Sequence, residues 1–135
     1  MLYEDITKKI LEACFEVSNE LGIGYLESVY EKALLIALRE KGLKAENQIP
    51  LQVKFRGEIV GEFFVDILVE DKILIELKVV NGLTKEFYAQ TINYLKATGI
   101  EVGLLINFGN AKLEYRRFNN KFIETTNSLK DFFTQ

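Results

Sequence analysis

The spacing of apolar residues changes twice along this chain, and that change limits the folds open to it. From Glu4 to Leu21 apolar residues recur at intervals of three and four, the period of an amphipathic helix, and a second stretch of this kind runs from about Leu26 to Lys41. From Gln48 the period falls to two, which is typical of a strand with one face in water. The sequence therefore predicts two helices followed by a sheet.

Three strands are expected next, over Gln48–Phe55, Ile59–Val69 and Ile73–Val80. Short polar breaks separate them, so they should form an antiparallel meander. Pro50 lacks the N–H that a central strand must donate, which predicts that the first strand lies at an edge of the sheet.

The remaining elements imply a crossover. Leu83–Thr98 has helical spacing, and Val102–Ile106 is a short apolar run, as in a strand covered on both faces. Since strand, helix and buried strand follow one another, this strand should lie parallel to the third. A further strand over Lys112–Phe118 and a short helix over Ser128–Phe133 complete an α/β fold, expected to be one domain spanning residues 1–135.

Composition excludes several kinds of chemistry. The chain has no histidine, which removes imidazole metal ligands and Ser-His triads, so a metal here would be a hard, oxygen-liganded one. Apolar runs are too short to cross a membrane, the N-terminus has no leader pattern, and the lone Cys14 falls on an apolar helical stripe, so we expect a soluble cytoplasmic protein. The net charge of -3 gives no global attraction to nucleic acid, although a local patch or bound metal ions would offset it.

Three charged residues interrupt the apolar central hairpin. Alternation puts Phe63, Val65, Ile67 and Val69 on one side of the second strand and Asp66 on the other, while Glu76 and Lys78 share one side of the third. Charges enclosed by apolar neighbours cost several kcal/mol each unless they are paired or bind a metal. The pattern favours a functional site and leaves open a structural ion pair or a wet cleft.

Hairpin register decides whether the carboxylates meet. A three-residue loop, Glu70–Lys72, puts Asp66 directly opposite Glu76, whereas a two-residue loop would put them on opposite faces. Opposed carboxylates have Cβ atoms about 5 Å apart and repel each other unless a cation intervenes. Mg²⁺ suits that gap because it needs only one or two protein carboxylates, and Lys78 is close enough to assist a metal-activated water.

Taken in order, these residues resemble a known family. The sequence is similar to the GxxExxY proteins, a branch of the PD-(D/E)XK nuclease-like superfamily, over about residues 5 to 118. The motif stands as Gly24–Tyr30 and is followed by Asp66, by Glu76-Leu77-Lys78, by the stretch Gln90–Gly99 and by Gly103–Gly109. The resemblance implies a restriction-endonuclease-like core with the N-terminal helices packed on the sheet.

The resemblance also implies roles for single residues. Asp66 and Glu76 would be metal ligands with the Leu77 carbonyl, Lys78 the catalytic lysine, and Glu27 the acidic residue of the first core helix. Gln90 and Tyr94 match a Q-x-x-x-Y element that flanks the site in some nucleases. From the residues alone, Glu27 also fits a carboxylate at a helix N-terminus, Gln90 and Tyr94 fit a local packing pair, and Gly24 and Tyr30 read as structural.

Two positions depart from the pattern. Val65 stands where the superfamily has proline, and Phe87 stands where members of the family often carry histidine. The leading hypothesis is a nuclease that depends on Mg²⁺ (or Mn²⁺) and hydrolyses phosphodiester bonds of DNA or RNA. The alternatives are a non-catalytic module that binds nucleic acid or protein, and a structural or oligomer-forming domain; the sequence is compatible with a monomer or a homo-oligomer.

Overall fold

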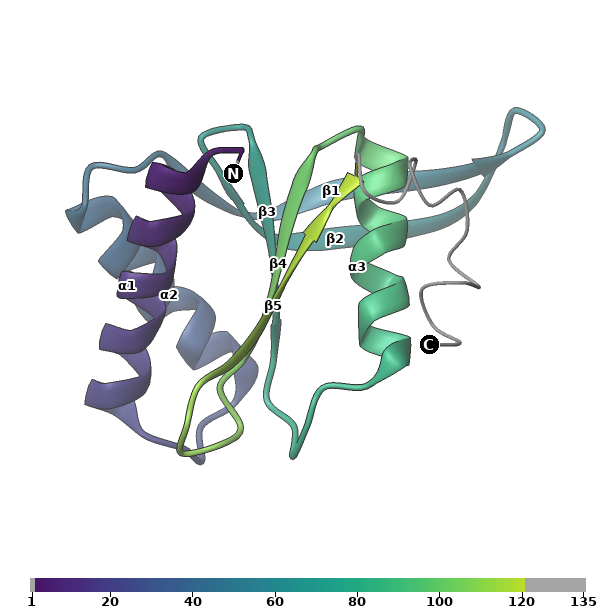
Figure 1. The fold of residues 1–135 in the computed structure, drawn as a ribbon. Coiled ribbons are helices and arrows are strands. Elements are labelled where there is room, and N and C mark those ends of the chain that lie inside the picture. The colour runs from purple at the N-terminus through teal and green to yellow at the C-terminus, as the bar shows by residue number, and fades with distance from the viewer. Residues whose placement is uncertain (1, 121–135) are drawn as a thin grey trace.

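A computed structural model describes residues 2–120, which form a five-stranded mixed sheet with helices on both faces (Figure 1). The sheet order is β1-β2-β3-β4-β5, so β1 lies at an edge, as Pro50 predicts. The predicted helix at Ser128–Phe133 lies outside the described residues. The elements are α1 (Glu4–Leu21), α2 (Glu27–Glu40), β1 (Ala45–Phe55), β2 (Glu58–Val69), β3 (Ile73–Lys78), α3 (Lys85–Thr98), β4 (Val102–Asn107) and β5 (Glu114–Asn119).

The predicted topology is confirmed. Strands β1, β2 and β3 form an antiparallel meander, β4 pairs parallel with β3 after the α3 crossover, and β5 pairs antiparallel with β4. Over residues 2–120, no helix combines the length and the apolar character that crossing a membrane requires.

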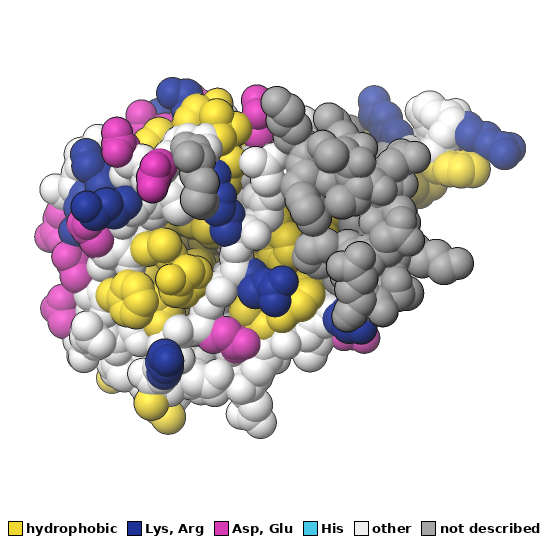
Figure 2. Space-filling model, in the orientation of Figure 1, with side chains coloured by type: hydrophobic (Ala, Val, Ile, Leu, Met, Phe, Trp, Pro, Cys, Tyr) yellow, Lys and Arg dark blue, Asp and Glu magenta, His cyan; other side chains and the backbone are white. Residues whose placement is uncertain are grey.

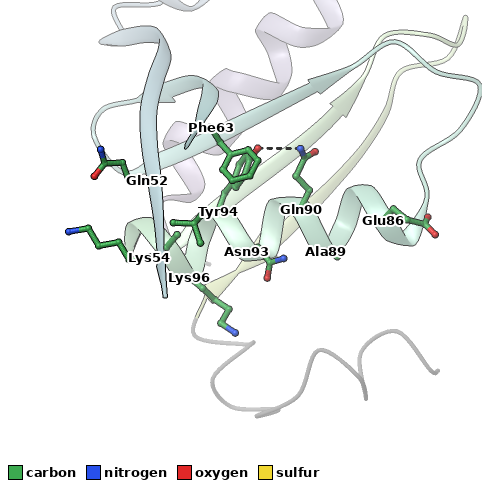
Figure 3. Close-up of a pocket in the computed structure, with 11 residues that line it drawn as sticks. Gln52, Lys54, Phe63, Glu86, Ala89, Gln90, Asn93, Tyr94 and Lys96 are labelled. Atoms are coloured by element: carbon green, nitrogen blue, oxygen red, sulfur yellow. Dashed lines mark hydrogen bonds between the residues drawn. The ribbon is translucent and has the colours of Figure 1, made fainter. Parts of the chain in front are cut away.

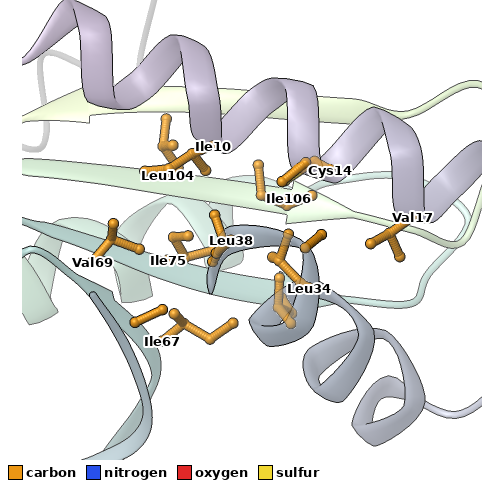
Figure 4. Close-up of a cluster of buried hydrophobic side chains, with 14 of the residues drawn as sticks. Ile10, Cys14, Val17, Leu34, Leu38, Ile67, Val69, Ile75, Leu104 and Ile106 are labelled. Atoms are coloured by element: carbon orange, nitrogen blue, oxygen red, sulfur yellow. The ribbon is translucent and has the colours of Figure 1, made fainter. Parts of the chain in front are cut away.

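The larger core lies between the sheet and the helices α1 and α2 (Figure 4). Helix α1 contributes Ile10, Cys14 and Val17, and α2 contributes Leu34 and Leu38, all from the stripes predicted by their spacing. Burial raises the pKa of the Cys14 thiol, which therefore stays protonated as a small core residue.

A smaller core lies on the other face of the sheet, under α3. It shows that the side-chain alternation predicted for β2 is incomplete. Val65 and Ile67 fall on the same side of β2 by alternation, yet Ile67 packs in the larger core while Val65 packs with Tyr94 and Leu95 of α3. The outer half of the β1–β2 hairpin is therefore twisted. On one side of Asp66 this face of β2 packs toward α1 and α2, and on the other side the same face packs toward α3.

The turn between β2 and β3 has the predicted three-residue length. Glu70 and Asp71 both have positive φ, 54° and 57°, in a loop without the expected glycine. Lys44 stabilises it: its N–H donates to Glu70 Oε2 at 2.6 Å and its ammonium lies 2.9 Å from Asp71 Oδ2. The resulting register pairs Val69 with Ile73 and Ile67 with Ile75.

Candidate active site

Asp66 and Glu76 lie where β2 separates from β3. The paired residues end at Ile67 and Ile75, and the next positions along the two strands are Asp66 and Glu76. There the carboxylates replace main-chain partners: the Asp66 N–H donates to Glu76 Oε1 at 3.1 Å, and the Leu77 N–H donates to Asp66 Oδ2 at 2.7 Å. The predicted register thus brings both carboxylates to the opening between the strands.

The electrostatics of the pair are those of two buried like charges. Glu76 is 3% exposed, and burial together with the Asp66 charge raises its pKa to about 8, although the Asp66 N–H and Lys78 act in the opposite direction. Burial also raises the pKa of Asp66, opposed by the Leu77 N–H and by Lys78. A cation bound between the two would favour the ionised carboxylates and so lower both pKa values.

Lys78 is on the same side of β3 as Glu76 and lies near the pair without a tight contact to it. Its charge lowers the pKa of Asp66 and of Glu76, while its ammonium lies 5.0 Å from the centre of the Phe87 ring. Among residues 2–120, the ion pairs within 4.0 Å join Lys41 or Lys44 to surface carboxylates and none involves Lys78. The geometry therefore does not support the structural reading in which Lys78 is the ion-pair partner of Glu76.

Helix α2 approaches the site with two acidic residues. Glu27 is its first residue; burial and the Asp66 charge raise the pKa of its carboxyl, and Lys78 lowers it. Glu31, one turn further along, is 8% exposed, and its charge contributes to the raised pKa of Asp66. The structure thus brings Glu27 into the electrostatic field of Asp66 and Lys78, and it also brings Glu31 there, a residue that the sequence analysis did not single out.

Two amides of β1 complete this side of the site. Asn47 Nδ2 donates to Glu31 Oε2 at 3.1 Å, and Gln48 Nε2 donates to Glu31 Oε1 at 2.7 Å. The Gln48 amide also lowers the pKa of Asp66. Glu31 could have been suspected from the sequence because it lies four residues after Glu27 on one helical face. Nothing in the sequence marks Gln48.

Gln90 and Tyr94 point together from α3, as their spacing predicts. Gln90 Nε2 donates to Tyr94 Oη at 3.2 Å, and the Phe63 ring of β2 lies 5.9 Å from the Tyr94 ring (Figure 3). The pKa of Tyr94 is raised by burial and by the charges of Glu76 and Asp66, which places its hydroxyl within the field of the carboxylate pair.

A cavity of about 1160 Å³ extends from this pair between α3 and the outer half of the β1–β2 hairpin. Its wall combines lysines, amides and aromatic rings, among them Gln52, Lys54, Phe63, Gln90, Asn93 and Lys96. On the face shown in Figure 2, acidic side chains lie mainly along the margin formed by α1 and α2. Basic and apolar side chains lie together at the tip of the β1–β2 hairpin. At that tip Arg56 lies 4.9 Å over the ring of the exposed Phe55.

Two other predicted motif residues have structural roles. The Tyr30 hydroxyl donates to the Gly22 carbonyl at 2.7 Å, and its fully buried ring stacks on Phe108 at 4.9 Å. Gly24 has φ 112°, in the loop that Tyr30 closes. Together they fix the start of α2 and hence the position of Glu27.

The donor set fits a hard divalent cation. Each carboxylate uses one oxygen to accept a main-chain N–H and keeps further lone pairs, and the Leu77 main chain lies beside Asp66. Within residues 2–120, no group of three or more acidic or cysteine side chains is arranged as a metal cage. Mg²⁺ needs only one or two protein carboxylates and retains waters, so two carboxylates suffice.

Comparison with known proteins identifies the family and the fold of this chain. The profile of the PD-(D/E)XK nuclease superfamily matches residues 4–118. The crystal structure of SSO0001 superposes with a TM-score of 0.56 and 19% identity, covering 95% of this chain and 69% of that one. No curated protein matches the sequence. The fold is restriction-endonuclease-like, and the chain belongs to the PD-(D/E)XK nuclease superfamily.

Proposed function

We propose that this protein is a nuclease that depends on Mg²⁺ or Mn²⁺ and hydrolyses phosphodiester bonds in nucleic acid. The observation that carries the proposal is the convergence of Asp66 and Glu76 at the opening between β2 and β3, with raised pKa values and Lys78 alongside. Buried like charges with perturbed pKa values are common in active sites. The finer assignment to the GxxExxY proteins is part of this proposal.

The residues have distinct roles in the proposed reaction. Asp66, Glu76 and the Leu77 carbonyl would hold the cation, which when bound polarises a water and stabilises the charge that develops on the phosphate. Lys78 would orient the attacking water or the phosphate, with its ammonium held beside the Phe87 ring. Glu27 would contribute a further carboxylate from the start of α2. Gln90 and Tyr94 would present an amide and a hydroxyl to the substrate.

The cavity beside α3 is the proposed path of the nucleic-acid strand. It leads to Tyr94 and offers features that proteins use for nucleic acids: lysines for phosphates, rings for stacking and amides for base edges. Its volume of about 1160 Å³ exceeds the roughly 300–1,000 Å³ of typical small-ligand pockets. A polymeric substrate therefore fits this space better than a small metabolite.

The test is cleavage of labelled single-stranded and double-stranded DNA and RNA with Mg²⁺, with Mn²⁺ and with a chelator. Wild-type protein should cut at least one substrate only with metal. Glu76→Gln and Lys78→Met, which nearly preserve side-chain size, should each lower the rate at least about 100-fold, the usual scale for losing a group that stabilises the transition state.

A matched control is Glu62→Gln, an exposed carboxylate on the same strand as Asp66, which should cut as the wild type does. Circular dichroism of all variants separates lost chemistry from lost folding. Equal cleavage by wild type and Glu76→Gln would exclude Asp66 and Glu76 as the reacting centre.

A second candidate is a nuclease-like module that binds nucleic acid without cutting it. Phe87 favours it, because this apolar ring lies next to Lys78 at a position where a titratable side chain could take part in chemistry. Such a module would retain nucleic acid with an affinity that falls steeply as salt increases, and no metal would produce cleavage.

A further inference from the structure

Gln48 has an unusual backbone for a residue inside a strand. Its φ is 53°, although it lies within β1 between the paired positions Asn47 and Ile49, which face Ile67 and Val65. Gln48 therefore stands at the position across from Asp66. A non-glycine residue with positive φ costs about 1 kcal/mol or more and persists only where surrounding contacts hold it.

The positive φ of Gln48 changes the direction of its side chain. Neighbouring residues of a regular strand point to opposite faces, yet the amides of Asn47 and Gln48 both donate to the Glu31 carboxylate, at 3.1 and 2.7 Å. The positive φ turns the Gln48 side chain toward α2, at the strand position across from Asp66, and the amide also lowers the pKa of Asp66.

The chemistry of the partners requires the Gln48 amide to donate to the carboxylates around it. Ionised carboxylates only accept, and the Gln48 amide nitrogen carries two N–H groups. One N–H goes to Glu31, which sets the amide orientation, and the second N–H is the one available to Asp66. On its other side Asp66 accepts the Leu77 N–H at 2.7 Å. The Asp66 carboxylate thus accepts a hydrogen bond from β3 and has an amide donor across from it on β1.

We propose that Gln48 is a positioning residue that fixes the Asp66 carboxylate, and that Glu31 fixes the Gln48 amide in turn. The consequence for the cation rests on the proposed function, because Asp66 is there a metal ligand. Outer partners of this kind typically change metal affinity about 10- to 100-fold when they are removed. The strained backbone of Gln48 is then retained for the site rather than for stability.

The decisive variant is Gln48→Gly, since glycine adopts φ 53° without strain, and the amide is removed together with the rest of the side chain. Its melting temperature should be no lower than that of the wild type. The Leu77 amide hydrogen should exchange about tenfold faster in metal-free protein, because its acceptor Asp66 is no longer fixed. The Kd for Mg²⁺, measured by calorimetry, should rise about 10- to 100-fold.

Arg56→Gly is the matched control. Arg56 has φ 52° and lies at the far end of the same hairpin, so glycine relieves the same strain away from the site. It should leave both Leu77 exchange and Mg²⁺ affinity unchanged. Two further variants should each speed Leu77 exchange and weaken Mg²⁺ binding, as Gln48→Gly does. They are Gln48→Asn, whose shorter side chain tolerates positive φ, and Glu31→Gln, which keeps the size of Glu31.

The outcomes separate this inference from the proposed function. Unchanged Leu77 exchange in Gln48→Gly and Gln48→Asn would overturn the positioning role, whatever the metal does. Faster exchange together with weaker Mg²⁺ binding supports it. Faster exchange in a protein whose wild type binds no Mg²⁺ supports the positioning of Asp66 and overturns the proposed metal chemistry instead.

Discussion

Glu76 is 3% exposed, and its carboxylate accepts one main-chain N–H. The positive charge of Lys78 only partly offsets the effects of burial and of the Asp66 charge on the pKa of Glu76. Its pKa in the folded chain is about 8, against 4.5 for an ordinary glutamate. Below about pH 4.5 the group is protonated in both states. Between the two values only the folded state holds the proton, so the free energy of unfolding falls as pH rises toward 8.

Glu76→Gln should remove this loss in metal-free protein. Glutamine keeps an oxygen to accept the Asp66 N–H and carries no charge, so the variant should be more stable than the wild type at pH 8 by about 4 kcal/mol. The difference should shrink as pH falls toward 5. Urea unfolding at several pH values measures it, and a wild type that gains stability between pH 5 and 8 relative to the variant would contradict the shift.

The residues of the site differed in how far the sequence revealed them. Asp66 and Glu76 could be paired in advance because loop length alone sets a hairpin register. Gln48 could not, since a β-bulge between Val53 and Lys54 shifts the β1–β2 register by one residue and thereby puts it across from Asp66. No local signal in the sequence predicts that bulge.

Among the elements, the end of β3 is held by a side chain from β4. Asn107 is fully buried; its Oδ1 accepts the N–H groups of Val80 and Gly109 at 3.0 and 2.9 Å, and its Nδ2 donates to the Val80 carbonyl and to Glu114. A Cβ on Gly109 would lie 2.2 Å from the Val80 carbonyl oxygen, so only glycine permits this approach. These contacts fix the chain directly after Lys78.

Asn107→Ala should therefore destabilise the protein by about 2–4 kcal/mol, because it leaves buried main-chain groups without partners. Chemical denaturation checks this, with Asn110→Ala in the same loop as a control expected to change stability by less than about 1 kcal/mol. If the two variants were equally stable, Asn107 would not be what holds the end of β3.

At the scale of the whole molecule, the site lies between two cores that occupy opposite faces of the sheet. The carboxylates of α2 approach from the larger core, whereas Tyr94 and Phe87 approach from the smaller core under α3. A cation bound between β2 and β3 would therefore connect both halves of the fold, and its binding energy would appear as stability of the entire chain.

Mg²⁺ should raise the melting temperature of the wild type at pH 8. At a concentration about 100 times Kd the gain is about 2.7 kcal/mol, or roughly 8–14 °C for a chain of this size. The shift should be smaller at pH 6, where protons compete for Glu76, and absent in Asp66→Asn. Sodium chloride at equal ionic strength is the control, and an equal shift with that salt would indicate screening rather than a site.

The sequence by itself determined the elements and their order, because hydrophobic period and loop length are local properties of a chain. The helix predicted at Glu4–Leu21 has those bounds, while β1 begins three residues before Gln48 and β3 ends at Lys78 rather than Val80. Strand ends depend on pairing partners, and these the local pattern does not contain.

Only the tertiary structure decided what surrounds the carboxylates. Alternation cannot show that the β1–β2 hairpin twists past Asp66, nor that Glu31 and Gln48 meet there, because both follow from how distant segments pack. The physical reason is that a buried charge is tolerated only through contacts to groups far away in the chain. Contacts between distant segments produce no periodic pattern in the sequence.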